Sequence, residues 1–128
     1  MLRMHVLALI ASGAAKTRRH LNEFFSRTFF AFQYGDVDEV MAKVGTILGE
    51  LSSYGFITNE QFISAAALDV HPLAATRTGM RVSELYLDPR SAHFMLTSLK
   101  PQAYVEHLLI INRCIEMLPL LRVKAREQ

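Results

Sequence analysis

The stretch that decides the fold of this chain is residues 76–92, which read Thr76-Arg77-Thr78-Gly79-Met80-Arg81-Val82-Ser83-Glu84-Leu85-Tyr86-Leu87-Asp88-Pro89-Arg90-Ser91-Ala92. Thr76 or Thr78 can cap a helix start, because a threonine hydroxyl accepts a hydrogen bond from a free backbone N–H. Val82, Leu85 and Tyr86 then fall on one helix face at spacings of three and four residues. The stretch therefore predicts a short helix that follows directly on a strand.

Asp88 and Pro89 predict that this helix ends and that another begins at once. Aspartate caps helix starts, and proline suits the first helical position, where no N–H is needed. The new helix is expected over residues 89–99, with an apolar stripe of Ala92, Met95, Leu96 and Leu99. A further helix opens at Pro101, and Pro119 interrupts its pattern.

Upstream of this stretch, apolar residues at helical spacing predict three helices and then a hairpin. The helices are expected over residues 2–12, from 17 to about 33, and from 36 or 38 to Gly55. The strands are expected at 56–58 and 73–76. Three helices followed by a hairpin is the winged-helix order, so the expected fold class is mainly α with a small β-hairpin, a winged helix followed by additional helices.

The formal net charge of +2 conceals an uneven distribution. Residues 1–34 hold five basic side chains and one acidic, residues 35–69 hold one basic and six acidic, and residues 70–128 hold eight basic and five acidic. The third helix would present Asp38, Glu39 and Glu50 to a DNA major groove, beside Lys43. Carboxylates repel phosphates, so a sequence-reading transcription regulator is disfavoured.

Three ordered blocks of the sequence resemble archaeal DNA repair helicases of superfamily 2. The run 76–92 resembles T-x-L-G-x-x-V-S-x-L-Y-I-D-P-x-(S/T)-A of that family. Ala15-Lys16-Thr17, Leu21, Phe24-Phe25 and Thr28-Phe29-Phe30 match A-K-T-x-x-x-L-x-x-F-F-x-x-T-F-F, and Leu48, Leu51, Gly55, Phe56 and Ile57 match L-x-x-L-x-x-x-G-(F/M)-(I/V). These helicases form the Ski-two-like group and are related to the helicase part of DNA polymerase theta.

The resemblance implies a winged-helix domain over residues 1–99 and the incomplete start of a helical, ratchet-like domain over residues 100–128. It implies a DNA-binding accessory part of an ATP-dependent 3′–5′ helicase that acts in DNA repair or fork processing. Its partners would be single-stranded or forked DNA, bound weakly and without sequence preference, and the parent's ATPase domains. The alternatives are a winged-helix transcription regulator and a protein-interaction module.

No chemistry is expected of the chain itself. It holds no G-x-x-x-x-G-K-(S/T) phosphate loop and no acidic strand end of the D-E-x-H type for Mg²⁺, so ATP and Mg²⁺ would bind elsewhere in the parent. The five histidines are scattered, and only His107 shares a helix face with the single cysteine, Cys114, so no metal site and no catalytic residue are expected. One cysteine, no signal peptide and no membrane-length apolar run predict a cytoplasmic chain.

The candidate nucleic-acid contacts are basic side chains on three predicted helices. The set consists of Lys16, Arg18, Arg19, His20, Lys43, Arg77 and Arg81. The first four lie at the start of the second helix, where free N–H groups favour an anion. A solvated helix end, or a surface that docks on an ATPase domain, is the alternative. Leu21, Phe24, Phe25, Phe29 and Phe32 are expected to be the buried stripe of that helix, and Phe30 lies off it.

Overall fold

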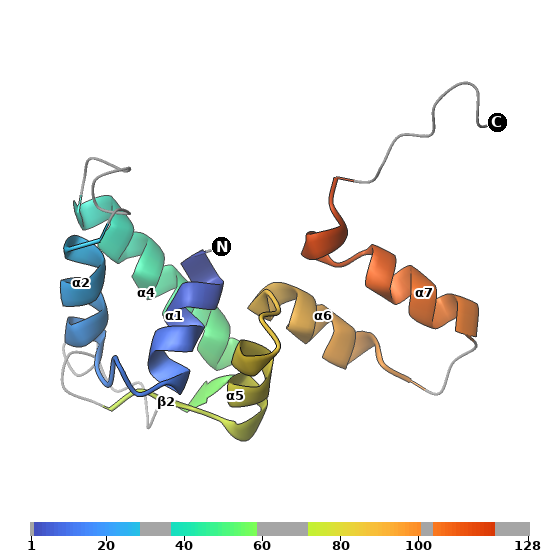
Figure 1. Ribbon diagram of the computed structural model, residues 1–128, viewed down its shortest axis with the longest axis horizontal. Coiled ribbons are helices and arrows are strands. Elements are labelled where there is room, and N and C mark those ends of the chain that lie inside the picture. The colour runs from blue at the N-terminus through green and yellow to red at the C-terminus, as the bar shows by residue number, and fades with distance from the viewer. Residues whose placement is uncertain (1, 29–36, 59–71, 101–103, 120–128) are drawn as a thin grey trace. The chain divides into compact units, whose positions relative to one another are not determined.

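The computed structural model describes residues 2–28, 37–58, 72–100 and 104–119. The chain forms two compact units, residues 1–89 and 90–128. The described elements are, in order, α1 (Leu2–Ala11), α2 (Arg18–Ser26), α4 (Val37–Ser53), β1 (Ile57–Thr58), β2 (Ala74–Ala75), α5 (Arg77–Glu84), α6 (Pro89–Ser98), α7 (Tyr104–Asn112) and the 3-10 helix η2 (Ile115–Met117) (Figure 1). The predicted fold class, mainly α with a small β-hairpin, is confirmed. The assignment of residues 1–99 and 100–128 to two domains stays a prediction.

Helices α1, α2 and α4 enclose the core of the first unit, and the apolar α1 contributes to its centre as predicted. The fully buried or nearly buried apolar side chains of the three helices are Val6, Leu7, Ile10, Leu21, Phe25, Val40, Val44, Ile47, Leu48 and Leu51. Gly13, with φ of +75°, ends the first helix in a conformation that favours glycine.

Helix α2 is shorter than predicted, because it ends at Ser26 with Arg27 as its cap, and residues 29–36 lie outside the described part. Leu21 and Phe25 are buried as expected, but Phe24 is 47% exposed, so its assignment to the buried stripe is wrong. Only the narrow face through Leu21 and Phe25 reaches the core, and the Phe24 ring instead packs edge-on against Phe25, with centroids 5.5 Å apart. Phe29, Phe30 and Phe32 fall among the undescribed residues.

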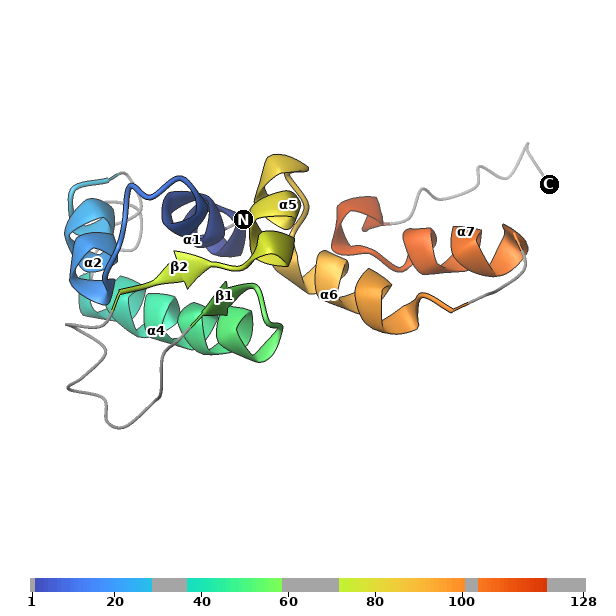
Figure 2. The same cartoon turned by 90° about the horizontal axis from the view of Figure 1, so that it is seen from below.

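The strands pair antiparallel, with Ile57 opposite Ala75 and Thr58 opposite Ala74 (Figure 2). Thr76, rather than Thr78, is the cap of α5: its hydroxyl oxygen accepts the Gly79 N–H at 3.1 Å. The same hydroxyl donates to the Gly55 carbonyl at 2.7 Å, and the Thr76 N–H donates to the Phe56 carbonyl at 2.9 Å. These bonds hold α5 against the beginning of β1.

Helix α5 ends one residue before Leu85, and the predicted apolar face is only partly correct. Val82 is buried, whereas Leu85 is exposed and Tyr86 is 80% exposed. Tyr86 has φ of +55° at the position after the helix cap, where its N–H donates to the Ser83 carbonyl at 3.1 Å. This left-handed residue turns the chain before the helix could bring Tyr86 onto the Val82 face.

The second unit contains most of α6, then α7 and η2. Within this unit, the Ile115 N–H donates to the Ser91 hydroxyl at 2.9 Å, beside the buried Cys114. The predicted apolar stripe of α6 is partly correct, because Ala92 is buried whereas Leu96 and Leu99 are exposed. None of the nine residues of α7 is buried, so its predicted apolar residues form no core among the described residues. Cys114 lies beyond the end of α7, so it does not share a helix with His107.

Candidate nucleic-acid interface

The start of α2 gathers four of the predicted basic residues. Thr17 caps the helix by accepting the His20 N–H at 3.2 Å, and the Lys16 carbonyl accepts the Leu73 N–H at 2.7 Å, which ties this turn to the segment before β2. Lys16 and Arg19 project into solvent, and the first turn contains no acidic residue. Cations at this positive end of the helix dipole do not stabilise the helix, whereas an anion bound there would.

Arg18 differs from its neighbours because its side chain is half-buried against α4. Its Nη2 atom lies 2.9 Å from the point that a Cβ would occupy at Gly45, and its Cζ lies 3.6 Å from that point. Neither Lys16, Arg18 nor Arg19 forms an ion pair with any residue that the structure describes. All three charges are therefore available to an external anion.

The single lysine of α4 and two of its carboxylates take part in ion pairs within the first unit. Lys43 pairs with Glu39 at 2.6 Å, and Glu50 pairs with Arg3 at 3.3 Å. Asp38 and Glu39 are exposed. Lys43 therefore contributes little net positive charge, and the exposed face of α4 remains acidic, which is unfavourable for a helix that reads DNA.

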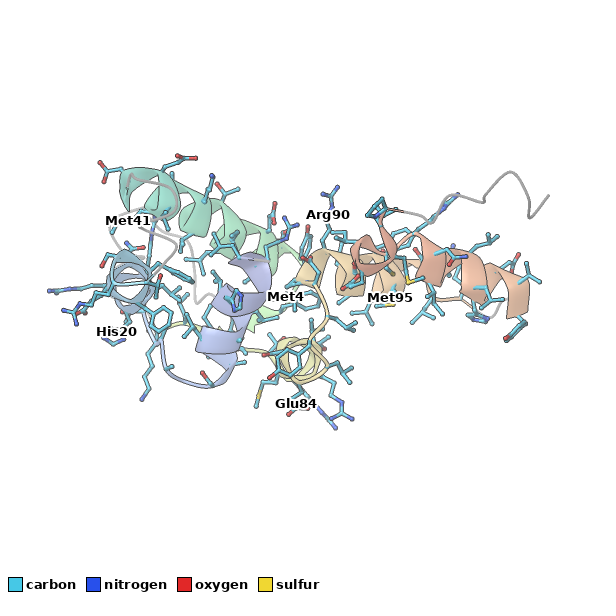
Figure 3. The ribbon with its side chains drawn as sticks, turned by 45° about the horizontal axis from the view of Figure 1, so that its top comes forward. Met4, His20, Met41, Glu84, Arg90 and Met95 are labelled. Carbon is cyan, nitrogen blue, oxygen red and sulfur yellow. The ribbon has the colours of Figure 1, made fainter. Side chains whose placement is uncertain are left out.

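Arg77 and Arg81 lie apart from the α2 residues. Figures 1 and 2 show α2 and α5 on opposite sides of α1, and Figure 3 labels His20 on α2 and Glu84 on α5, well apart from each other. Arg81 pairs with Glu84 at 2.9 Å, and both side chains are exposed. The predicted contact set thus divides into a group at the start of α2, the paired Lys43, and a pair of arginines on α5.

Phe24 adds an aromatic surface that the sequence did not predict. A hollow of about 460 Å³ lies beside it, lined by Ala14, His20, Glu23, Phe24, Arg27 and Thr28. Arg27 pairs with Glu23 at 2.9 Å, while the His20 and Phe24 rings both border the hollow. Exposed aromatic rings beside cations are features of surfaces that bind single-stranded nucleic acids. The apolar spacing of α2 carried no signal that Phe24 would face outward.

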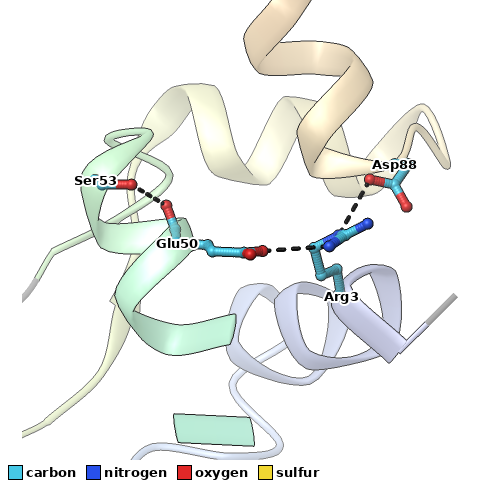
Figure 4. A network of polar contacts seen from close by, with 4 residues as sticks. All are labelled: Arg3, Glu50, Ser53 and Asp88. Atoms are coloured by element: carbon cyan, nitrogen blue, oxygen red, sulfur yellow. Dashed lines mark hydrogen bonds and ion pairs between the residues drawn. The ribbon is translucent and has the colours of Figure 1, made fainter. Parts of the chain in front are cut away.

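A second group that the sequence did not connect is the network of Arg3, Glu50 and Asp88 (Figure 4). Arg3 Nε lies 3.4 Å from Asp88 Oδ1, an ion pair without hydrogen-bond geometry, and Arg3 Nη1 lies 3.3 Å from Glu50 Oε2. The Asp88 side chain is only 6% exposed, against 25% for Arg3 and 35% for Glu50. The network joins α1 and α4 to the residue that precedes α6, and its buried position indicates a structural role.

The described residues offer little to other chemistries. No three histidine, cysteine, aspartate or glutamate side chains among them lie close enough to hold a metal ion. None of the described helices has the length and apolar character that a membrane crossing requires. Burial raises the pKa of the Cys114 thiol, the Glu116 carboxylate raises it further, and a hydrogen bond with Ser91 acts in the opposite direction.

No protein-family model matches this chain, but individual proteins do. The ATP-dependent DNA helicase Hel308 of Methanocaldococcus jannaschii is 35% identical over 99% of this chain and 10% of its own length. Hel308 of Methanococcus vannielii is 29% identical over 99% of this chain and 22% of its own length. Hel308 of Caldivirga maquilingensis is 33% identical over 77% of this chain and 13% of its own length.

The chain spans between a tenth and about a fifth of the length of these relatives. The first two matches extend over 99% of this chain and therefore include the start of α2 and the junction of α5 and α6. This chain is therefore homologous, over almost its whole length, to a segment of the archaeal Hel308 DNA helicases.

Proposed function

We propose that this chain is the nucleic-acid-binding, winged-helix part of an ATP-dependent 3′–5′ DNA helicase that acts in DNA repair or at replication forks. The names of its relatives support the parentage, and three helices followed by an antiparallel strand pair support the winged helix. Because the chain spans so little of those relatives, ATP and Mg²⁺ belong to other parts of the parent in this proposal. The parent's ATPase domains are its protein partners, residues 100–128 open the ratchet-like domain, and the proposed location is cytoplasmic.

The observation that carries this proposal is the cluster of unpaired cations at the start of α2. Lys16, Arg18 and Arg19 have no carboxylate partner within the described chain, and they lie at the start of a helix, where free N–H groups favour an anion. A nucleic-acid backbone supplies the missing anions as a row of phosphates. The acidic exposed face of α4 is a poor alternative surface for DNA.

The test is titration of the 128-residue chain with labelled single strands and duplexes of unrelated sequence at three salt concentrations. Two or three phosphate contacts should give a dissociation constant of about 10⁻⁴–10⁻⁶ M at physiological salt. For duplex DNA, the logarithm of the association constant should fall with the logarithm of the salt concentration at a slope of roughly −2 to −3. The pure chain should neither hydrolyse ATP nor unwind DNA.

Replacing Arg18 and Arg19 together by alanine should flatten the duplex slope by about two units and weaken all sequences alike. The matched control replaces Arg77 and Arg81 by alanine, which removes the same charge on the far side of α1. The control should change the slope less, because Arg81 is already paired with Glu84. Nanomolar binding of one duplex sequence, lost on changing Lys43 or Thr46, would instead establish the transcription-regulator alternative.

A further inference from the structure

Gly45 and Gly49 both lie inside α4, where each weakens the helix relative to alanine. At Gly49 no heavy atom lies within 4 Å of the point that a Cβ would occupy. At Gly45 that point is 2.9 Å from the Arg18 Nη2 atom, closer than real side-chain contacts allow. Only the first glycine therefore has an occupant for the space that its missing side chain leaves.

The occupant is a guanidinium group with no competing partner among the described residues. Two carboxylates of α4 are engaged elsewhere, because Glu39 pairs with Lys43 and Glu50 pairs with Arg3. The Arg18 guanidinium thus lies close to the α4 backbone at Gly45. Its N–H donors remain available for an external acceptor, and guanidinium binds phosphate through two parallel hydrogen bonds.

We propose that Gly45 is a positioning residue, which holds the Arg18 guanidinium ready for a nucleic-acid phosphate. This inference rests on the proposed contact at the start of α2. Arginine loses much rotational freedom when it is immobilised by a ligand. A side chain already confined by packing loses less of that freedom, so the binding of a phosphate is stronger than it would be to a fully solvated arginine.

The experiment compares Gly45→Ala with Gly49→Ala, a matched change one turn further along the same helix. Each adds one methyl group and raises helix propensity, so neither variant should unfold more easily than the unsubstituted chain. In Gly45→Ala the methyl group displaces the tip of a flexible side chain, which costs little folding stability. Thermal unfolding followed by circular dichroism verifies that both variants are folded.

Titration with a labelled single strand and a labelled duplex should show about 3- to 10-fold weaker binding for Gly45→Ala, as expected when one side chain must be immobilised anew. Gly49→Ala should bind as the unsubstituted chain does. In the Arg18→Ala background, adding Gly45→Ala should cause no further loss, since the glycine acts through the arginine. The nitrogen-15 resonance of the Arg18 Nε–H group should change in Gly45→Ala and remain unchanged in Gly49→Ala.

Two failures are distinguishable. If Arg18→Ala weakens binding but Gly45→Ala binds like Gly49→Ala, or leaves the Arg18 resonance unchanged, the positioning role is refuted while the contact at α2 stands. If Arg18→Ala leaves binding and its salt dependence unchanged, the proposed contact is refuted and the positioning role with it.

Discussion

Substitution of Gly79 by alanine tests a close approach between two backbone segments in the first unit. The methyl group would overlap the Phe56 carbonyl oxygen and would lie 2.8 Å from its carbonyl carbon and 3.0 Å from its Cα. Carbon atoms pack about 3.5–4.0 Å apart, and backbone atoms cannot rotate away as a side-chain tip can. Helix α5 would therefore have to withdraw from the beginning of β1.

Withdrawal strains a connected group of hydrogen bonds. The Thr76 N–H donates to the Phe56 carbonyl at 2.9 Å, and the Gly79 N–H donates to the Thr76 hydroxyl at 3.1 Å. Overpacking costs about 1–3 kcal/mol, and each lost hydrogen bond costs about 0.5–1.5 kcal/mol. Alanine returns about 1 kcal/mol through its higher helix propensity. The expected net loss in the free energy of unfolding is about 2 kcal/mol.

The assay is urea unfolding followed by circular dichroism, with Gly49→Ala as the control. That control meets no neighbouring atom and should stabilise the chain by up to about 1 kcal/mol. A Gly79→Ala variant that unfolds within about 0.5 kcal/mol of the unsubstituted chain would refute the steric argument. Equal midpoints for the two alanine variants would do the same.

Three further outcomes are expected. Arg3→Met should lower the free energy of unfolding by about 1–3 kcal/mol, because it removes an ion-pair partner from the buried Asp88 carboxylate. Glu50→Gln, at the more exposed end of the network, should lower it by less than about 1 kcal/mol. Urea unfolding of both variants measures the difference. Phe24→Leu should weaken single-strand binding about 5-fold or more if a base stacks on the ring, with little change for duplex, and equal losses on both probes would exclude stacking. The pKa of Cys114 in the folded chain is raised above the ordinary value of 9.0. The contribution of this thiol to stability should therefore be present below pH 9.0 and lost as the pH rises through the folded pKa. Unfolding measurements from about pH 8 to 11 should show this dependence, and Cys114→Ala should abolish it.

The helices and strands of the first unit were largely predictable, because their signals are local. Apolar periodicity located α1, α4 and the strand pair, and Gly55, with φ of +74°, ends the α4 region where the glycine predicted. The prediction for α5 failed at its end, because nothing in the spacing of Leu85 and Tyr86 indicates that the chain turns through a left-handed residue there. A non-glycine residue in that conformation depends on the surrounding structure.

The candidate site was predictable in its residue types and only partly in its arrangement. Lys16, Arg18 and Arg19 follow one another in the sequence, so any helix start at Thr17 brings them together. That Arg81 is paired with Glu84 follows from helical spacing and could also have been anticipated. The contact of Arg18 with Gly45 joins residues far apart in the sequence, and no local pattern contains it.

The sequence by itself determined the mainly helical class, the order of the elements, the segregation of charge and the likeness to DNA helicases, since each depends on residue identity and short spacing. Tertiary structure decided which apolar residues are covered and which charges remain unpaired. Phe24 and Phe25 are equally apolar, yet only the packing of α2 against its neighbours buries one and exposes the other. Arg3 and Arg18 are equally charged, yet folding brings Asp88 to the first and a bare glycine backbone to the second. The reason is physical: burial and pairing are properties of contacts between distant segments, and those contacts exist only once the chain has folded.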